Sequence, residues 1–146
     1  PTSSVVTLGD SSQLNTNDAT CIMYAFAEKT GYSKFGSYVG NGNADGTFVY
    51  TGFKPAWVLV KRTDSAEGWY IFDNKRSDFN LSDDALRANL SNAEISNWGV
   101  GFDFLSNGFK ARATDASINS SGGSYIYMCF AEAPLVGSNN VPCTAR

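Results

Sequence analysis

The chain has 146 residues, a formal net charge of −3 and only 17% charged residues, so it lacks the clustered Lys and Arg that nucleic-acid binding needs. It contains no histidine, which excludes the usual Ser-His and Cys-His triads and removes the commonest general base and metal ligand. No apolar run approaches the about 20 residues of a membrane-spanning helix. We therefore expect no enzymatic activity, no cofactor, no nucleic-acid partner and no membrane insertion.

The chain begins with a segment that is repeated near its other end. Residues 5–8 are a short strand candidate, and residues 20–28 form an apolar strand candidate after a polar turn. Residues 14–28 align without a gap on residues 118–132, and both copies end in Phe-Ala-Glu. We interpret residues 1–28 as the C-terminal strands of a preceding repeat, packed on a main β-sandwich module that covers residues 29–134. Residues 135–146 would then form an extended C-terminal tail.

The middle of the chain contains further strand candidates, because β-branched and aromatic residues alternate between turn signals. They cover residues 35–39, 47–53, 56–63 and 69–72. In the third of these, Trp57 and Leu59 face one way while Val58 and Val60 face the other. A strand that is apolar on both faces is typical of the middle of a packed sheet or sandwich.

Residues 74–97 are the least β-like segment. Ser82 is a candidate helix N-cap, and Asp83 and Asp84 would lie in the first turn, where the helix dipole favours carboxylates. The segment holds at most one short helix, near residues 82–90, or only a loop.

A hairpin is predicted at Asn107-Gly108, because these residue types accept positive φ in a two-residue type I′ turn. That turn sets a register in which the opposed pairs are Phe104 and Ala111, Phe102 and Ala113, and Asp103 and Arg112. A last strand covers residues 124–132. Many short strands and almost no helix predict an all-β fold, an antiparallel β-sandwich of jelly-roll type.

Four long phrases resemble one known family. They cover residues 31–38 (GYSKFGSY), 48–62 (FVYTGFKPAWVLVKR), 103–110 (DFLSNGFK) and 125–132 (YIYMCFAE). The chain resembles a domain of poorly defined function in tail-fibre and other virion structural proteins of tailed bacteriophages, marine ones especially. The resemblance implies that such modules follow related copies, that Pro1 is not the start of the gene product and that Arg146 is a natural C-terminus. It supplies no catalytic residues.

Carbohydrate binding is the functional interpretation that the residue types favour, since sugar sites combine an exposed aromatic ring with amides and carboxylates from loops. The aromatic candidates border Gly- and Asn-rich loops and are Trp69, Trp98, Tyr32, Tyr38 and Tyr50. The alternative is that these rings pack in the core or between subunits.

Three other residue groups carry weaker signals. A modest acidic cluster could bind calcium but lacks an EF-hand pattern, and solvated carboxylates are the alternative; it consists of Asp64, Asp73, Asp78, Asp83 and Asp84. Glu28 and Glu132 end equivalent strands, where a structural cap is favoured over a glycosidase pair. The free cysteines Cys21 and Cys129 are expected to behave as small hydrophobes within strands.

The sequence therefore predicts a non-enzymatic virion protein, the C-terminal module of a phage tail fibre or spike displayed for recognition of a host-surface glycan. Its partners would be other copies of itself in a homotrimer, which gives avidity, and other virion proteins. The alternative is a module that decorates the capsid or joins virion parts without binding a receptor. A glycan-degrading enzyme is the third hypothesis, disfavoured by the missing histidine.

Overall fold

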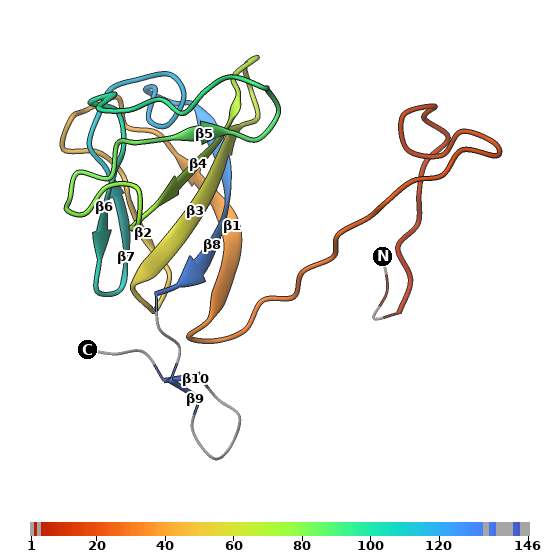
Figure 1. The fold of residues 1–146 in the computed structure, drawn as a ribbon, viewed down its shortest axis with the longest axis horizontal. Coiled ribbons are helices and arrows are strands. Elements are labelled where there is room, and N and C mark those ends of the chain that lie inside the picture. Colours follow the sequence, from red (N-terminus) through yellow and green to blue (C-terminus); the bar gives the residue numbers. More distant parts are fainter. Residues whose placement is uncertain (1, 3, 133–134, 137–141, 144–146) are drawn as a thin grey trace.

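Two antiparallel sheets pack face to face as a β-sandwich in the computed structural model, which describes residues 2, 4–132, 135–136 and 142–143 (Figure 1). The larger sheet has the order β1-β8-β3-β4-β5, whose bounds are Ser33–Val39, Ser124–Ala131, Pro55–Arg62, Trp69–Asp73 and Leu86–Arg87. The smaller sheet has the order β2-β7-β6, with bounds Phe48–Tyr50, Gly108–Ala111 and Phe102–Leu105. The predicted all-β sandwich is confirmed.

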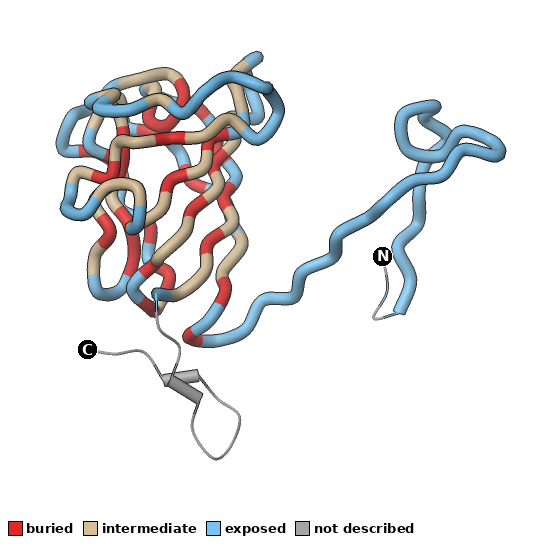
Figure 2. The backbone as a smooth tube through the Cα atoms, in the orientation of Figure 1, coloured by how far each residue is buried: buried red, intermediate tan, exposed pale blue. Residues whose placement is uncertain are grey.

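The buried residues gather in the strands of the two sheets (Figure 2). The core that they form is rich in aromatic rings. Val58 and Val60 of β3 are fully buried there, whereas Trp57 and Leu59 on the other face of the strand are only half-buried. The predicted alternation along this strand is therefore confirmed. The buried ring of Phe109 on β7 joins the two sheets, because it contacts aromatic rings from both of them.

The hairpin between β6 and β7 forms, but the predicted register is wrong by two residues. Leu105 opposes Gly108, so the turn residues are Ser106 and Asn107. Neither has positive φ, which excludes a type I′ turn. Gly108 is required in the strand for space, because a Cβ there would lie 2.1 Å from the carbonyl oxygen of Val49 on β2.

The optional short helix near residues 82–90 does not form among the described residues. Ser82 pairs with Phe102 in an isolated bridge, and Leu86 and Arg87 form the edge strand β5. The two carboxylates expected in a first helical turn instead accept backbone N–H groups from residues 97 and 99. These bonds satisfy the carboxylates outside any helix, and the backbone N–H groups of Asp83 and Asp84 donate to the hydroxyl of Ser77.

Residues 2 and 4–28 form an arm that runs away from the sandwich, and neither strand expected there is present (Figures 1 and 2). Residues 4–30 are exposed throughout, but the arm contacts the main module at its base, where Phe26 lies against Phe35 and Phe130. The expected packing of the whole segment on the main module stays a prediction. A strand requires a hydrogen-bonding neighbour, and the described part of the chain supplies none along residues 20–28. The origin of this segment in a preceding repeat stays a prediction.

The C-terminal tail falls partly outside the described residues. Its described part is a short antiparallel ladder of β9 (Leu135–Val136) and β10 (Pro142–Cys143). The expectation of an extended tail therefore applies mostly to positions outside the described residues.

Candidate functional site

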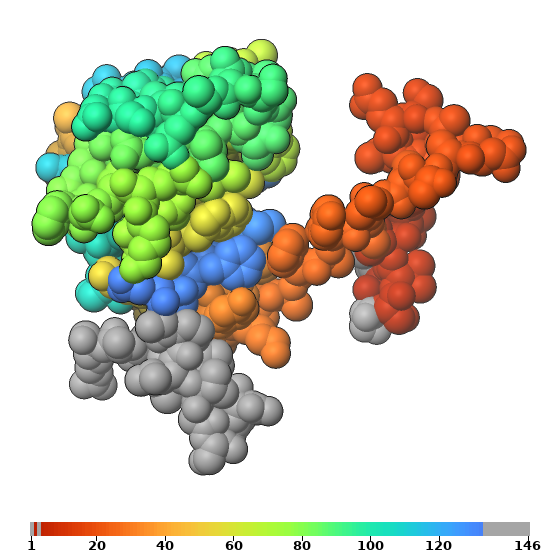
Figure 3. Space-filling model, viewed as in Figure 1, coloured from red at the N-terminus to blue at the C-terminus, as the bar shows by residue number. Residues whose placement is uncertain are grey.

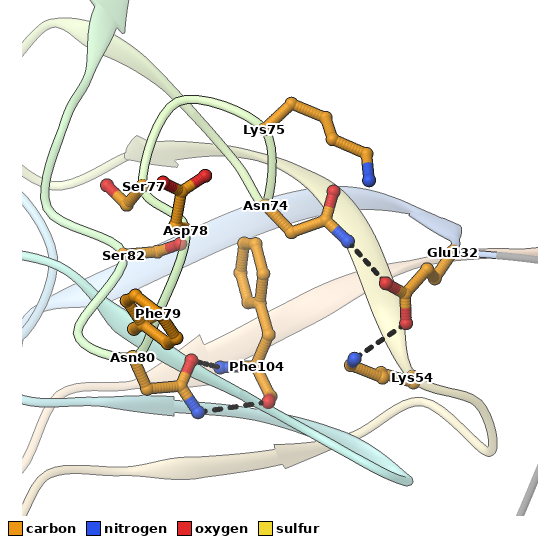
Figure 4. Close-up of a pocket in the computed structure, with 10 residues that line it drawn as sticks. All are labelled: Lys54, Asn74, Lys75, Ser77, Asp78, Phe79, Asn80, Ser82, Phe104 and Glu132. Atoms are coloured by element: carbon orange, nitrogen blue, oxygen red, sulfur yellow. Dashed lines mark hydrogen bonds and ion pairs between the residues drawn. The ribbon is translucent and has the colours of Figure 1, made fainter.

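A polar groove of about 320 Å³ lies beside the loop that follows β4 (Figure 4). Ten residues from four separate stretches of the chain line it: Lys54, Asn74, Lys75, Ser77, Asp78, Phe79, Asn80, Ser82, Phe104 and Glu132. One side carries Asp78 and Phe79, and the other carries the Lys54, Asn74 and Glu132 cluster (Figure 4). The groove thus presents ammonium, amide, carboxylate and aromatic groups together.

The loop over residues 74–82 is held in shape by side chains that bind its own backbone. The Asp73 carboxylate accepts the backbone N–H groups of Lys75 and Arg76 at 2.9 and 3.0 Å, and the Arg76 guanidinium at 2.8 Å. The hydroxyl of Ser77 accepts the backbone N–H of Asp83 at 3.3 Å. Such local side-chain to backbone bonds fix a loop that has no ladder of its own.

Two further contacts fasten this loop to the sandwich. The amide of Asn80 binds both backbone groups of Phe104 on β6, accepting its N–H at 2.9 Å and donating to its carbonyl at 3.2 Å. At the other side, the Glu132 carboxylate accepts the Asn74 amide at 2.8 Å and pairs with the Lys54 ammonium at 2.6 Å. The expected capping role of Glu132 fits this clamp between the loop and β3.

Phe79 is the most unusual residue of the groove, because 84% of this large apolar side chain is exposed. Single exposed apolar side chains are common on protein surfaces, but an exposed aromatic ring offers a flat apolar face to a ligand. Beside it are amides, carboxylates and ammonium groups that bind hydroxyl groups in either direction. The groove therefore has the composition of a site for a polyhydroxylated ligand.

The aromatic candidates chosen from the sequence are not gathered at this groove or at any one place. Tyr38 is buried, its ring stacks on Tyr125 at 4.9 Å and its hydroxyl donates to the Ile118 carbonyl at 2.7 Å. Burial raises its pKa well above the usual value. Trp98 is half-buried and stacks on Tyr70 at 5.1 Å. Both rings are packing residues, as the alternative interpretation held.

The other three rings keep an exposed face but lie apart. Trp69 begins β4 on the outer face of the large sheet, opposite Lys61. Tyr32 packs beside Phe130 with ring centroids 5.7 Å apart. Tyr50 borders a second hollow of about 220 Å³ next to the base of the arm, which is also lined by the Glu28 and Lys34 ion pair.

The acidic residues do not converge. Asp64 pairs with Arg62 at 2.7 Å, which lowers the pKa of that carboxyl through the hydrogen bond, and Asp73 pairs with Arg76. Within residues 4–132 and the other described positions, there is no group of three or more His, Cys, Asp and Glu side chains placed to hold a metal. The same part of the chain contains no helix with the length and apolarity needed to cross a membrane.

The two cysteines differ from each other. Cys129 is buried and hydrogen-bonds the Lys34 carbonyl, and burial raises the pKa of its thiol to about 12. It behaves as the expected small hydrophobe. Cys21 does not, because it lies on the exposed arm.

Sequence reasoning missed Phe79, Asn74, Asn80 and Lys54, and little could have indicated them. Phe79 stands in a segment with no strand or helix pattern, and its exposure follows from the shape of the loop. Lys54 comes from the chain just before β3, so only the folded sandwich brings it to the loop after β4. Asp78, Ser82, Phe104 and Glu132 carried sequence signals, but each for a different reason and none as part of a groove.

Comparison of the sequence with models of known protein families identifies the family of this chain. The model of the family described as a domain of unknown function (DUF7483) matches residues 1–134. No curated protein and no solved structure gives a significant match. The matched range includes both the arm and the whole sandwich, with the groove. The chain belongs to the DUF7483 family of domains of unknown function.

Proposed function

We propose that this chain is a non-enzymatic structural module of a phage virion, the C-terminal part of a tail fibre or spike, and that its polar groove binds a host-surface glycan. The observation that carries the binding proposal is the exposed Phe79 ring across the groove from the Lys54, Asn74 and Glu132 cluster. A sugar ring offers an apolar C–H face and a rim of hydroxyl groups, and the groove offers a complement to each.

The rigidity of the groove supports this proposal. A binding loop must hold its polar groups in place before the ligand arrives, because ordering them on binding costs affinity. Here Asn80 fixes the loop to β6, and Glu132 fixes it to the start of β3. The groove is therefore pre-organised, although it lies in a loop.

The assignment to a virion is supported by the four phrases that resemble tail-fibre and virion proteins. They include all of β2 and β3 and most of β1, β6, β7 and β8, that is, six of the eight strands that build the sandwich. Such a module would act in several copies on a symmetric assembly, since weak glycan contacts gain strength through multivalency.

The alternative, a module that decorates the capsid or joins virion parts without a receptor, is favoured by a different observation. Residues 4–28 carry many exposed large apolar side chains, and such surface is typical of assembly contacts. On that alternative the groove would bind no glycan, and the arm would be the functional part.

Glycan-array binding by the purified chain tests the proposal, with Phe79→Ala as the variant. Loss of the ring should weaken binding about five- to tenfold, because a stacked aromatic contact contributes about 1 kcal/mol. Leu90→Ala is the matched control, since Leu90 is also exposed, at 49%, and does not line the groove. Binding that is absent in the unmodified chain, or equal in both variants, would remove the groove from the proposal.

A further inference from the structure

The outer face of the large sheet carries one continuous apolar row. The strand registers place one large apolar side chain from each of its five strands side by side, in the order Phe35, Met128, Leu59, Ile71 and Leu86. All five are half-buried, so the row is open to solvent. Sheets in sandwiches bury one face and keep the other polar. This sheet is apolar on both faces, and we call this set of five residues the outer apolar row.

The arm carries a second exposed apolar surface. Eight of its large side chains are at least 49% exposed: Val5, Val6, Leu8, Leu14, Ile22, Met23, Tyr24 and Phe26. Its two limbs enclose a hollow of about 550 Å³, lined mostly by apolar side chains from residues 6–8 and 21–23. Figure 3 shows the arm standing clear of the sandwich. Two large apolar surfaces in one chain are therefore both without a cover.

We propose that the outer apolar row of one copy binds the arm of a second copy, through the six arm residues 20–25 that precede Phe26. The base of the arm already shows this contact within one chain, because the Phe26 ring lies 6.5 Å from Phe35 and 5.9 Å from Phe130 on the outer face. The residues just before it, 22–24, continue the same apolar sequence into solvent.

The lengths of the two surfaces agree. The row crosses four spacings between neighbouring strands, about 19 Å in total, and an extended six-residue segment spans about 20 Å.

A second copy is favoured over the chain's own arm. Phe26 holds the base of the arm at one corner of the outer face, and residues 22–24 then lead away from it (Figure 1). Covering its own row would require a sharp reversal near residue 25. Residues 10–30 contain neither Gly nor Pro, the residues that such turns use most. An arm that reaches a neighbouring copy needs no reversal.

The internal repeat fits this arrangement. Residues 20–27 align with β8, whose outward side chains are Ile126, Met128 and Phe130. The equivalent arm positions are Ile22, Tyr24 and Phe26, so the arm has the apolar alternation of a sheet strand without a sheet of its own. This inference goes beyond the proposed glycan site, because it names the contact through which copies associate.

Light scattering after size-exclusion chromatography of the full chain tests this contact. The unmodified chain should elute with at least twice the monomer mass. The arm variant Ile22→Asp/Tyr24→Asp and the face variant Leu59→Lys should each elute at monomer mass. Lys is tolerated on this face, since Lys61 of the same strand already lies there. Phe79→Asp is the control: it charges an equally exposed ring elsewhere and should leave the mass unchanged.

Mixing the two monomeric variants distinguishes an arm that binds a second copy from an arm that covers the outer apolar row of its own chain. The intact arm of the Leu59→Lys copy can bind the intact face of the Ile22→Asp/Tyr24→Asp copy, so the mixture should regain mass above the monomer. A mixture that stays monomeric, or an unmodified chain that is itself monomeric, would overturn the proposal. An assembly that both variants retain would do so too. Loss of groove binding through Phe79→Ala with the mass unchanged tests the glycan proposal separately.

Discussion

Phe109→Ala should lower the free energy of unfolding by about 4 kcal/mol, because large-to-small changes of buried phenylalanine cost 3–5 kcal/mol through lost burial and a residual cavity. Phe109 is fully buried on β7. Its ring centroid lies 5.1 Å from that of Phe102, 5.3 Å from Tyr127 and 6.2 Å from Tyr38, each in an edge-to-face arrangement. The change therefore removes a ring that contacts both sheets.

Urea unfolding at fixed protein concentration measures this loss. Phe79→Ala is the same chemical change at an exposed position and should stay within about 0.5 kcal/mol of the unmodified chain. Since small domains have only about 5–15 kcal/mol of stability, Phe109→Ala should leave a much less stable protein. A loss below about 1 kcal/mol for Phe109→Ala would contradict the packing described for the core.

Asn119→Leu should cost a similar amount, about 4 kcal/mol, although leucine has nearly the same size. Asn119 is fully buried, and its amide nitrogen lies 2.8 to 2.9 Å from the Asn41 side-chain oxygen and the carbonyls of Asn43 and Ala113. Its oxygen accepts the backbone N–H of Asn41 at 3.0 Å. Each buried group left without a partner costs about 1–3 kcal/mol.

The same unfolding measurement checks this change, and hydrogen exchange at the Asn41 amide reports where it acts. Exchange there should accelerate, because that N–H loses its acceptor. Asn15→Leu is the matched control, since Asn15 aligns with Asn119 in the internal repeat but lies exposed on the arm. Equal stability of the two variants would show that the buried amide does not hold the loops together.

The fold could be predicted to the extent that local patterns determine it. Residues 57–60 place apolar side chains on both faces of one strand, and this pattern was enough to predict a strand in the middle of a sheet. In the structure, Val58 and Val60 of β3 are buried and the side chains on the other face are half-buried. The hairpin register was not predictable in this way. Gly108 reads as a turn residue, but it is needed where β2 approaches β7 closely, and such an approach between distant segments leaves no local signal.

The arm shows the limit of the same reasoning. Residues 20–28 and β8 share one sequence pattern, yet only β8 has strands on both sides, β1 and β3. The alternation of apolar side chains indicates that a segment can form a strand in a sheet. It does not indicate which chain supplies the neighbouring strands.

For the candidate site, the sequence allowed a prediction of the types of chemical group but not of the residues that supply them. An aromatic ring beside polar loop residues was the expected composition, and the groove has it, but with Phe79 in place of the rings first considered. Tyr38 was misplaced because its position in β1 turns the ring into the core. The groove itself joins the start of β3, the end of β8 and the loop after β4, so it exists only in three dimensions.

Electron microscopy of phage particles that carry this protein, labelled with antibodies against the chain, tests the central proposal most directly. A fibre or spike module displayed for host recognition predicts label at the distal ends of the tail fibres. Label on the capsid lattice or along the tail tube would contradict host recognition and favour the decorating or joining role. Intact particles without any label, in a preparation where the antibody detects the protein after disruption, would contradict surface display altogether.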